Sequence, residues 1–172
     1  MANLVQQVTG ATEIKAIIAR VPQAARGRGL YLAIGEEVKG QTERRFDLSM
    51  APDGSRWKQS LRVTLGLGGG PTLVKSGDMR RSLTVNADDQ GGELVIPKAY
   101  AATHQFGATI KPVRAKTLRF ALGRKGNRTN FVFARSVTIP KREMLGFSAE
   151  NVADIATVAR DHILDVARGA RP

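Results

Sequence analysis

The excess of positive charge in this chain comes almost entirely from one segment, which must lie where it meets solvent or an oppositely charged partner. Residues 94–142 hold eleven Lys or Arg and no Asp or Glu, whereas the remaining 123 residues hold 16 basic and 15 acidic side chains. The net charge of +12 therefore belongs almost entirely to that segment. A long basic segment of this kind predicts a surface that docks onto something acidic, either another protein or nucleic acid.

The composition predicts one globular domain over residues 1–172. Hydrophobic residues make up 42% of the chain and aromatic residues only 5%, so we expect a mostly aliphatic core. The chain has no cysteine, which excludes a disulfide scaffold, a cysteine-ligated metal and a thiol nucleophile. The first residues lack the pattern of a secretory signal, and no run approaches the roughly 18 apolar residues of a membrane span, so we expect no membrane association.

Hydrophobic periodicity predicts helices towards both ends of the chain. Apolar residues recur at helical spacing from Ile14 to Val21, with Thr12 as the expected cap and the Val21–Pro22 step as the end. A longer helix is expected over 24–48. Ser148 is the expected cap of a final helix that buries one apolar stripe.

Short alternating runs between these helices predict two hairpins, one near 83–96 and one over about 117–135 with a basic tip. In the second hairpin, alternation places three phenylalanines in the sheet interior, at positions 120, 131 and 133. The order of elements, without βαβ alternation, predicts an α+β fold. We expect one small antiparallel sheet of about four strands, flanked by helices, with a projecting basic hairpin over 107–138 and a flexible Gly-rich loop over 58–75.

The residues that could carry chemistry do not form a recognisable catalytic, metal or cofactor site. His104 and His162 lie in no nucleophile motif, and two isolated histidines give little support for zinc. We expect packing or hydrogen bonding from both. The glycine-rich stretch before Lys75–Ser76 lacks the glycine that a phosphate loop needs directly before this pair, because Val74 occupies that position. We therefore predict a protein that is not an enzyme and binds no cofactor.

Four strings in order carry a resemblance to a known family. They are PDGSRW at 52–57, SGDMRRS at 76–82, YAATHQFG at 100–107 and IPKREMLG at 139–146. They resemble the P-x-G-x-x-W, S-G-x-L-x-x-S, Y-A-x-x-H-x-F-G and P-x-R-x-x-L-G patterns of the phage virion morphogenesis, or tail completion, family of Mu-like phages. The resemblance spans about residues 10–168. The chain departs from these patterns at Met79, where leucine is usual, and at Glu143–Met144, where Pro-Phe is commoner.

The resemblance implies a structural virion protein of the head–tail neck, in which a ring, usually hexameric, ends the tail tube and joins it to the capsid connector. The implied partners are further copies of the chain, an adjacent neck or connector ring and the tail tube protein. Basic side chains lining the lumen would make passing contact with genomic DNA. The implied location is the virion, after assembly in the host cytoplasm. The alternative is a nucleic-acid-binding module that uses the basic segment 94–142.

The resemblance also implies scaffold roles for particular residues. Tyr100 and Phe106 would anchor their segment against the sheet, Gly77 and Gly107 would permit turns, and Trp57 would pin the 52–57 turn to the core. His104 belongs to the same scaffold set. The docking residues that we expect on and beside the projecting hairpin are basic: Arg119, Arg124, Lys125, Arg128, Lys141 and Arg142.

Overall fold

Long helices lie near both termini of the computed structural model, and short helical pieces lie between them. The structure describes residues 10–67, 70–125 and 128–169, without the side chains of 122–130. The long helices are α1 (Ala11–Arg20), α2 (Arg28–Leu48) and α6 (Ala149–Ala167). The short pieces are η1 (Gln23–Ala25), α3 (Leu61–Thr64), α4 (Asp78–Arg81) and α5 (Ala101–Phe106).

The described strands form three separate antiparallel pairs. The pairs are β1 (Thr84–Ala87) with β2 (Gly92–Val95), β3 (Ala108–Ile110) with β6 (Val137–Ile139), and β4 (Leu118–Lys125) with β5 (Arg128–Ala134). The α+β class is therefore confirmed, and so are both predicted hairpins. The expectation of one four-stranded sheet was wrong. The β3–β6 pair was missed because three-residue strands are too short to show alternation in the sequence.

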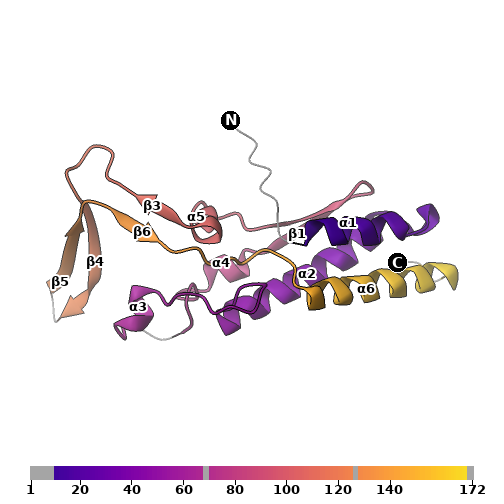
Figure 1. Cartoon of the computed structure of the whole chain (residues 1–172), viewed down its shortest axis with the longest axis horizontal. Helices are drawn as coiled ribbons and strands as arrows, with labels where there is room; N and C mark the ends of the chain where they lie inside the picture. The colour runs from indigo at the N-terminus through magenta and orange to yellow at the C-terminus, as the bar shows by residue number, and fades with distance from the viewer. Residues whose placement is uncertain (1–9, 68–69, 126–127, 170–172) are drawn as a thin grey trace.

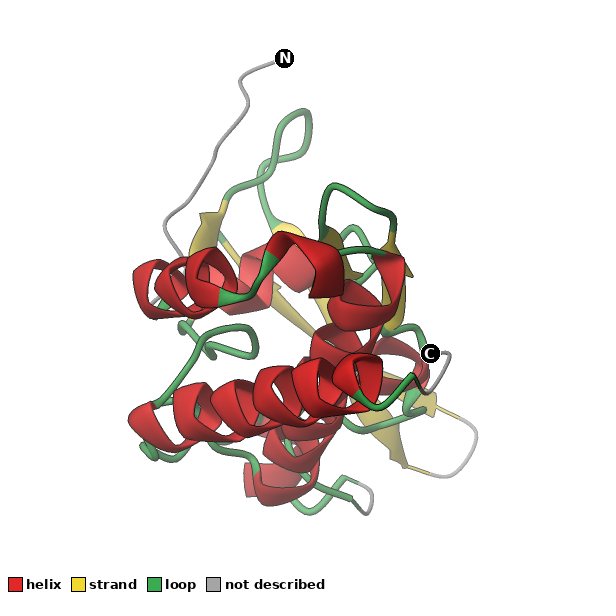
Figure 2. Ribbon diagram, turned by 90° about the vertical axis from the view of Figure 1, so that its right-hand side faces the viewer, coloured by secondary structure: helices red, strands yellow, loops and turns green. Residues whose placement is uncertain are grey.

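The elements spread along one long axis. Figure 1 shows α1, α2 and α6 gathered at one end and the β4–β5 hairpin at the other, with β3 and β6 running between the hairpin and the rest of the chain. Figure 2 looks along this axis from the helical end, so the helices lie in front and most of the strands lie behind them.

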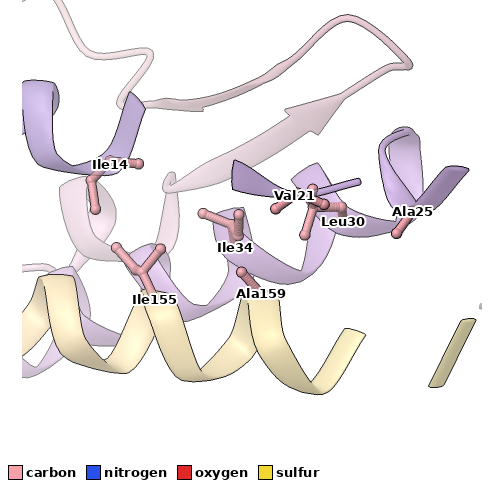
Figure 3. Packing of buried hydrophobic residues seen from close by; sticks show 7 residues of the cluster. All are labelled: Ile14, Val21, Ala25, Leu30, Ile34, Ile155 and Ala159. Atoms are coloured by element: carbon pink, nitrogen blue, oxygen red, sulfur yellow. The ribbon is translucent and has the colours of Figure 1, made fainter. Parts of the chain in front are cut away.

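The helical end has its own core. Figure 3 shows aliphatic side chains from α1, α2 and α6 meeting between the helices. Leu30 and Ile34 of α2 pack in the same buried cluster as Ile155 and Ala159 of α6, as the apolar spacing predicts. The cluster is completed by Ile14, Val21 and Ala25. Burial of these side chains is the dominant favourable contribution to folding at this end.

The predicted N-terminal cap is confirmed for α6 but not for α1. Ser148 caps α6, and its hydroxyl accepts the backbone N–H of Asn151 in a reciprocal capping box. The predicted cap of α1 was wrong. Thr12 lies inside α1, and Gly10 caps the helix with φ of 79°, a left-handed conformation that glycine adopts readily.

A second buried cluster joins α2 to the middle of the molecule. Its centre is Phe46, whose ring meets that of Trp57 edge-on with centroids 5.6 Å apart. The Trp57 indole N–H donates to the backbone carbonyl of Glu143 at 3.0 Å. Met79 and Met144 are buried in the same cluster. Both positions that depart from the family pattern by carrying methionine therefore lie in the core, where methionine fills irregular space.

Candidate docking arm

The functional candidate is a projecting segment, residues 107–140, which we call the arm. It contains β3, the β4–β5 hairpin and β6. The string at 100–107 leads into it and the string at 139–146 leads out of it. The geometry of the arm is therefore set by how these two strings are held together.

Gln105 ties the two strings to each other. Its amide Nε2 donates to the carbonyl of Leu145 at 2.8 Å. Its Oε1 accepts the backbone N–H groups of Met144 and Leu145 at 2.8 and 3.0 Å. A further bond runs from the Arg142 backbone N–H to the carbonyl of His104 at 2.7 Å. We call this set of bonds the clasp, and it fixes both ends of the arm at one place.

Arg45 of α2 extends the clasp to the helical core. Its guanidinium donates to the carbonyl of Met144 at 2.9 Å and to the side-chain oxygen of Asn151, which belongs to the α6 cap. Burial lowers the pKa of Arg45 to about 10, against an opposing effect of Glu143, so the group stays charged at neutral pH. A charged hydrogen bond of this kind is stronger than a neutral one and links α2, the base of the arm and α6.

Arg142 is part of the same base and is not a surface residue. It is only 5% exposed, and its Nε donates to the carbonyl of Lys58 at 2.8 Å. Its Nη1 lies 3.3 Å from Nδ1 of His104. This placement corrects its assignment as a docking residue. Its neighbour Lys141 is exposed and forms an ion pair with Glu143 at 2.6 Å.

The two glycines singled out from the sequence lie at turns. Gly77 has φ of 75° directly before α4, and Gly107 has φ of 73° directly after α5. A Cβ on Gly107 would lie 3.0 Å from the backbone nitrogen of Lys141 and 3.1 Å from the carbonyl oxygen of Ile139. The segments 100–107 and 139–146, which enter and leave the arm, therefore approach each other so closely that this position needs glycine.

The two aromatic residues of the 100–107 string do not anchor it. Tyr100 and Phe106 are each 47% exposed, whereas Ala101 and Gln105 are buried. This corrects the expectation that aromatic rings hold the segment. Gln105 could have been noticed as an amide that both donates and accepts, but nothing in the sequence says which backbone groups it meets.

The β4–β5 hairpin is apolar on both faces and largely uncovered. Its register places Arg119 opposite Phe133 and Ala121 opposite Phe131, which together make one face, the outer face. The guanidinium of Arg119 lies 4.5 Å from the centre of the Phe131 ring. Phe133 is 63% exposed. The expectation that these rings and Phe120 lie in a sheet interior was therefore wrong, because no second sheet covers this hairpin within the described residues.

The opposite face of the hairpin borders an open groove of about 1040 Å³. Phe120 and Val132 line it from the hairpin, and Leu61 and Leu67 line it from the segment around α3. Leu61 and Leu67 are themselves exposed. The glycine-rich stretch is thus the opposite wall of this groove, and it contains the short helix α3 that its sequence pattern did not predict.

Positive charge lies along the whole arm. Of the expected docking residues on the hairpin, Arg119 is on the outer face, while the side chains of Arg124, Lys125 and Arg128 lie outside the described residues. Further exposed basic residues on the arm are Lys111, Arg114, Lys116 and Arg135. Val113, between them, is 96% exposed. The arm thus combines exposed apolar side chains with charge of one sign.

Among the described residues, no group of three or more His, Cys, Asp or Glu could hold a metal ion. Within the same ranges, no helix is long and apolar enough to cross a membrane. His162 lies part-buried on α6, whereas His104 lies on α5.

The clasp yields a test of which residue holds the 100–107 string. We expect Gln105→Ala to lower the free energy of unfolding by about 2 kcal/mol or more, because it leaves two backbone N–H groups and a carbonyl without a partner at roughly 1–3 kcal/mol each. Phe106→Ala is the matched control on the adjacent, half-exposed residue and should cost less. Urea unfolding measures both. A larger loss from Phe106→Ala would mean that the ring anchors the segment after all.

The contact between His104 and Arg142 predicts a pH dependence. Burial, and then the charge of Arg142, lowers the pKa of His104 below its usual 6.5. Between the folded pKa of His104 and its unfolded pKa of about 6.5, the unfolded chain therefore binds more protons than the folded chain. The free energy of unfolding decreases as the pH falls through this range. Urea unfolding between pH 7.5 and 5 should show a steeper decrease for the wild type than for His104→Gln. Equal slopes for wild type and His104→Gln would contradict the assignment.

The chain was compared with known protein families, curated proteins and solved structures. The model of a family described as the phage virion morphogenesis family matches residues 9–164. No curated protein matches the chain, and no solved structure does.

Proposed function

This chain belongs to the phage virion morphogenesis family, whose model spans most of its length, and we propose on that basis that it is a structural protein of the head–tail neck. Membership of the family makes it a protein of phage virion structure and assembly. Our finer proposal is a ring of copies, six in the form that the resemblance implies, that ends the tail tube and joins it to the capsid connector.

The observation that carries this proposal is the uncovered arm. β4 and β5 pack chiefly against each other, and no other described element makes more than marginal contact with them. An isolated two-stranded hairpin is at best marginally stable in water, and a contiguous exposed apolar patch commonly marks an interaction site. A hairpin with exposed Phe131, Val132 and Phe133 therefore needs a partner.

The clasp supports the same proposal, because it gives the arm a fixed base. The polar side chains at that base are occupied with structural bonds: Gln105 with the backbone of 144–145, Arg45 with Met144, and Arg142 with Lys58. His104 faces Arg142 in the same base. We propose that these residues position the arm for assembly and perform no catalysis.

The charge of the arm fits assembly between rings or between copies. Complementary charge speeds encounter and rejects wrong partners more than it adds affinity. A subunit that offers a basic arm at one end and receives a different surface at the other forms head-to-tail contacts, which close into a ring when the rotation between copies allows it. The adjacent connector ring and the tail tube protein are the further partners that we propose.

The charged tip of the hairpin provides the test. We expect the triple reversal Arg124→Glu, Lys125→Glu and Arg128→Glu to leave the subunit folded, with unchanged circular dichroism and melting, and to stop head–tail joining. Complementation of a phage lacking the gene, followed by electron microscopy, should then show separate heads and tails. The control is Lys15→Glu, Arg44→Glu and Arg56→Glu, which reverses three exposed charges outside the arm. Normal virions from the tip variant would refute a docking role for the tip.

One observation favours a second candidate function, nucleic-acid binding by the arm. Single-stranded nucleic acid binds to basic grooves in which aromatic rings stack on bases, and Phe131 and Phe133 are exposed beside Arg119. If this is the function, DNA retention on filters should be strong at low salt and fall steeply at moderate salt. Phe131→Ala/Phe133→Ala should then reduce retention. No retention even at low salt would remove this candidate.

A further inference from the structure

The chain contains two hairpins of opposite charge. The β1–β2 hairpin with its flanks, residues 82–97, carries Asp88, Asp89 and Glu93 and no Lys or Arg. The arm between residues 111 and 135 carries eight Lys or Arg and no Asp or Glu. No described lysine or arginine forms an ion pair with those three carboxylates. Neither charge is therefore neutralised by a salt bridge within the described part of the chain.

These hairpins lie at opposite ends of the long axis. Asp89, at the β1–β2 turn, accepts the backbone N–H of Arg28 at 3.0 Å, which places the turn beside the first residue of α2. Figure 1 shows this turn reaching over the helical end while β4 and β5 form the other end. One copy therefore cannot bring its own two hairpins together, but two neighbouring copies can.

The β1–β2 hairpin has one covered face and one open face. Val85 packs so closely on α2 that a Cβ on Gly35 would lie 2.4 Å from its Cγ1. The register pairs Asn86 with Glu93 and Thr84 with Val95 on the other face. Thr84, Asn86 and Glu93 are exposed, and the Asn86 amide donates to Glu93 at 2.9 Å. This open face combines a carboxylate with the methyl groups of a threonine and a valine.

We propose that the outer face of the β4–β5 hairpin of one copy packs on the open face of the β1–β2 hairpin of the next copy. Phe131 and Phe133 cover Thr84 and Val95, and Arg119 lies towards Glu93. Arg135, which follows β5 by one residue, extends the basic edge. The contact is sheet on sheet, with the two hairpins about 10 Å apart and the side chains of their facing sides interdigitating. This inference rests on the proposed ring and names its subunit interface.

Electrostatic repulsion between like-charged arms favours a head-to-tail contact between copies over a symmetric one. A symmetric contact between two arms would bring sixteen like charges together, because each arm carries eight, and it is strongly disfavoured. A contact between unlike hairpins sets three carboxylates against the eight basic residues of the arm, and it leaves each copy with one basic and one acidic end to offer. Repetition of the same contact builds a ring or an open filament.

A charge-exchange experiment tests the interface. The arm variant is Arg119→Glu/Arg135→Glu, and the receiving variant is Thr84→Lys/Glu93→Lys. The second variant leaves Asp88 and Asp89 in place, because Asp88 accepts the N–H groups of Gln90 and Gly91 in the turn and Asp89 accepts that of Arg28. Lys15→Glu/Arg44→Glu is the control for charge. Sedimentation velocity at low and moderate salt measures the assembly, and thermal melting checks the fold.

We expect the wild type and the control to assemble. Each hairpin variant alone should remain monomeric up to at least ten times the concentration at which the wild type assembles. An equimolar mixture of the two hairpin variants should assemble again. When the two variants alternate, every contact pairs unlike charges. Three results would overturn the interface: assembly of either variant alone at the wild-type concentration, a mixture that stays monomeric, or a wild type that is monomeric throughout. The proposed neck function would survive any of these if the chain is still found in purified virions, and would fail if it is absent from them.

Discussion

The structure depends on the hydrogen bonds between the Gln105 amide and the backbone of residues 144–145. They join the string that enters the arm to the string that leaves it, across about 40 residues of intervening chain. Arg45 then carries the connection into α2 and the α6 cap. Buried amides and guanidinium groups must be fully bonded to be tolerated, so they specify one arrangement where apolar packing alone would allow several. The direction of the arm relative to the helical core follows from this arrangement.

The arm gains the least stabilisation from contacts within its own copy. Its apolar side chains are exposed and its charges are of one sign, so within a single copy it gains little from burial, and none of its described basic side chains forms an ion pair. Both deficits disappear when a partner covers the Phe131–Phe133 face and supplies carboxylates. The β1–β2 hairpin of another copy offers both features, and its position at the far end of the long axis makes the contact one between subunits.

Much of this organisation could be predicted from the sequence. Helical spacing identified the stripes of α2 and α6, turn and alternation signals identified both hairpins, and the charge count located the arm. The clasp could not be predicted, because Gln105 and Arg45 find their partners through contacts between distant segments. The exposure of Phe120, Phe131 and Phe133 was missed for a related reason. Alternation gives the two faces of a strand but not whether anything covers them, and no second sheet of the described chain covers this hairpin.

The central claim is that the arm docks onto another copy in the virion neck. A cryo-electron microscopy reconstruction of the neck from purified virions tests it most directly, because it shows ring position, copy number and the arm contact together. We expect a closed ring at the end of the tail tube in which each β4–β5 hairpin lies on the β1–β2 hairpin of its neighbour. A neck without this chain, or a ring whose β4–β5 hairpins touch no other copy of the chain, would contradict the claim.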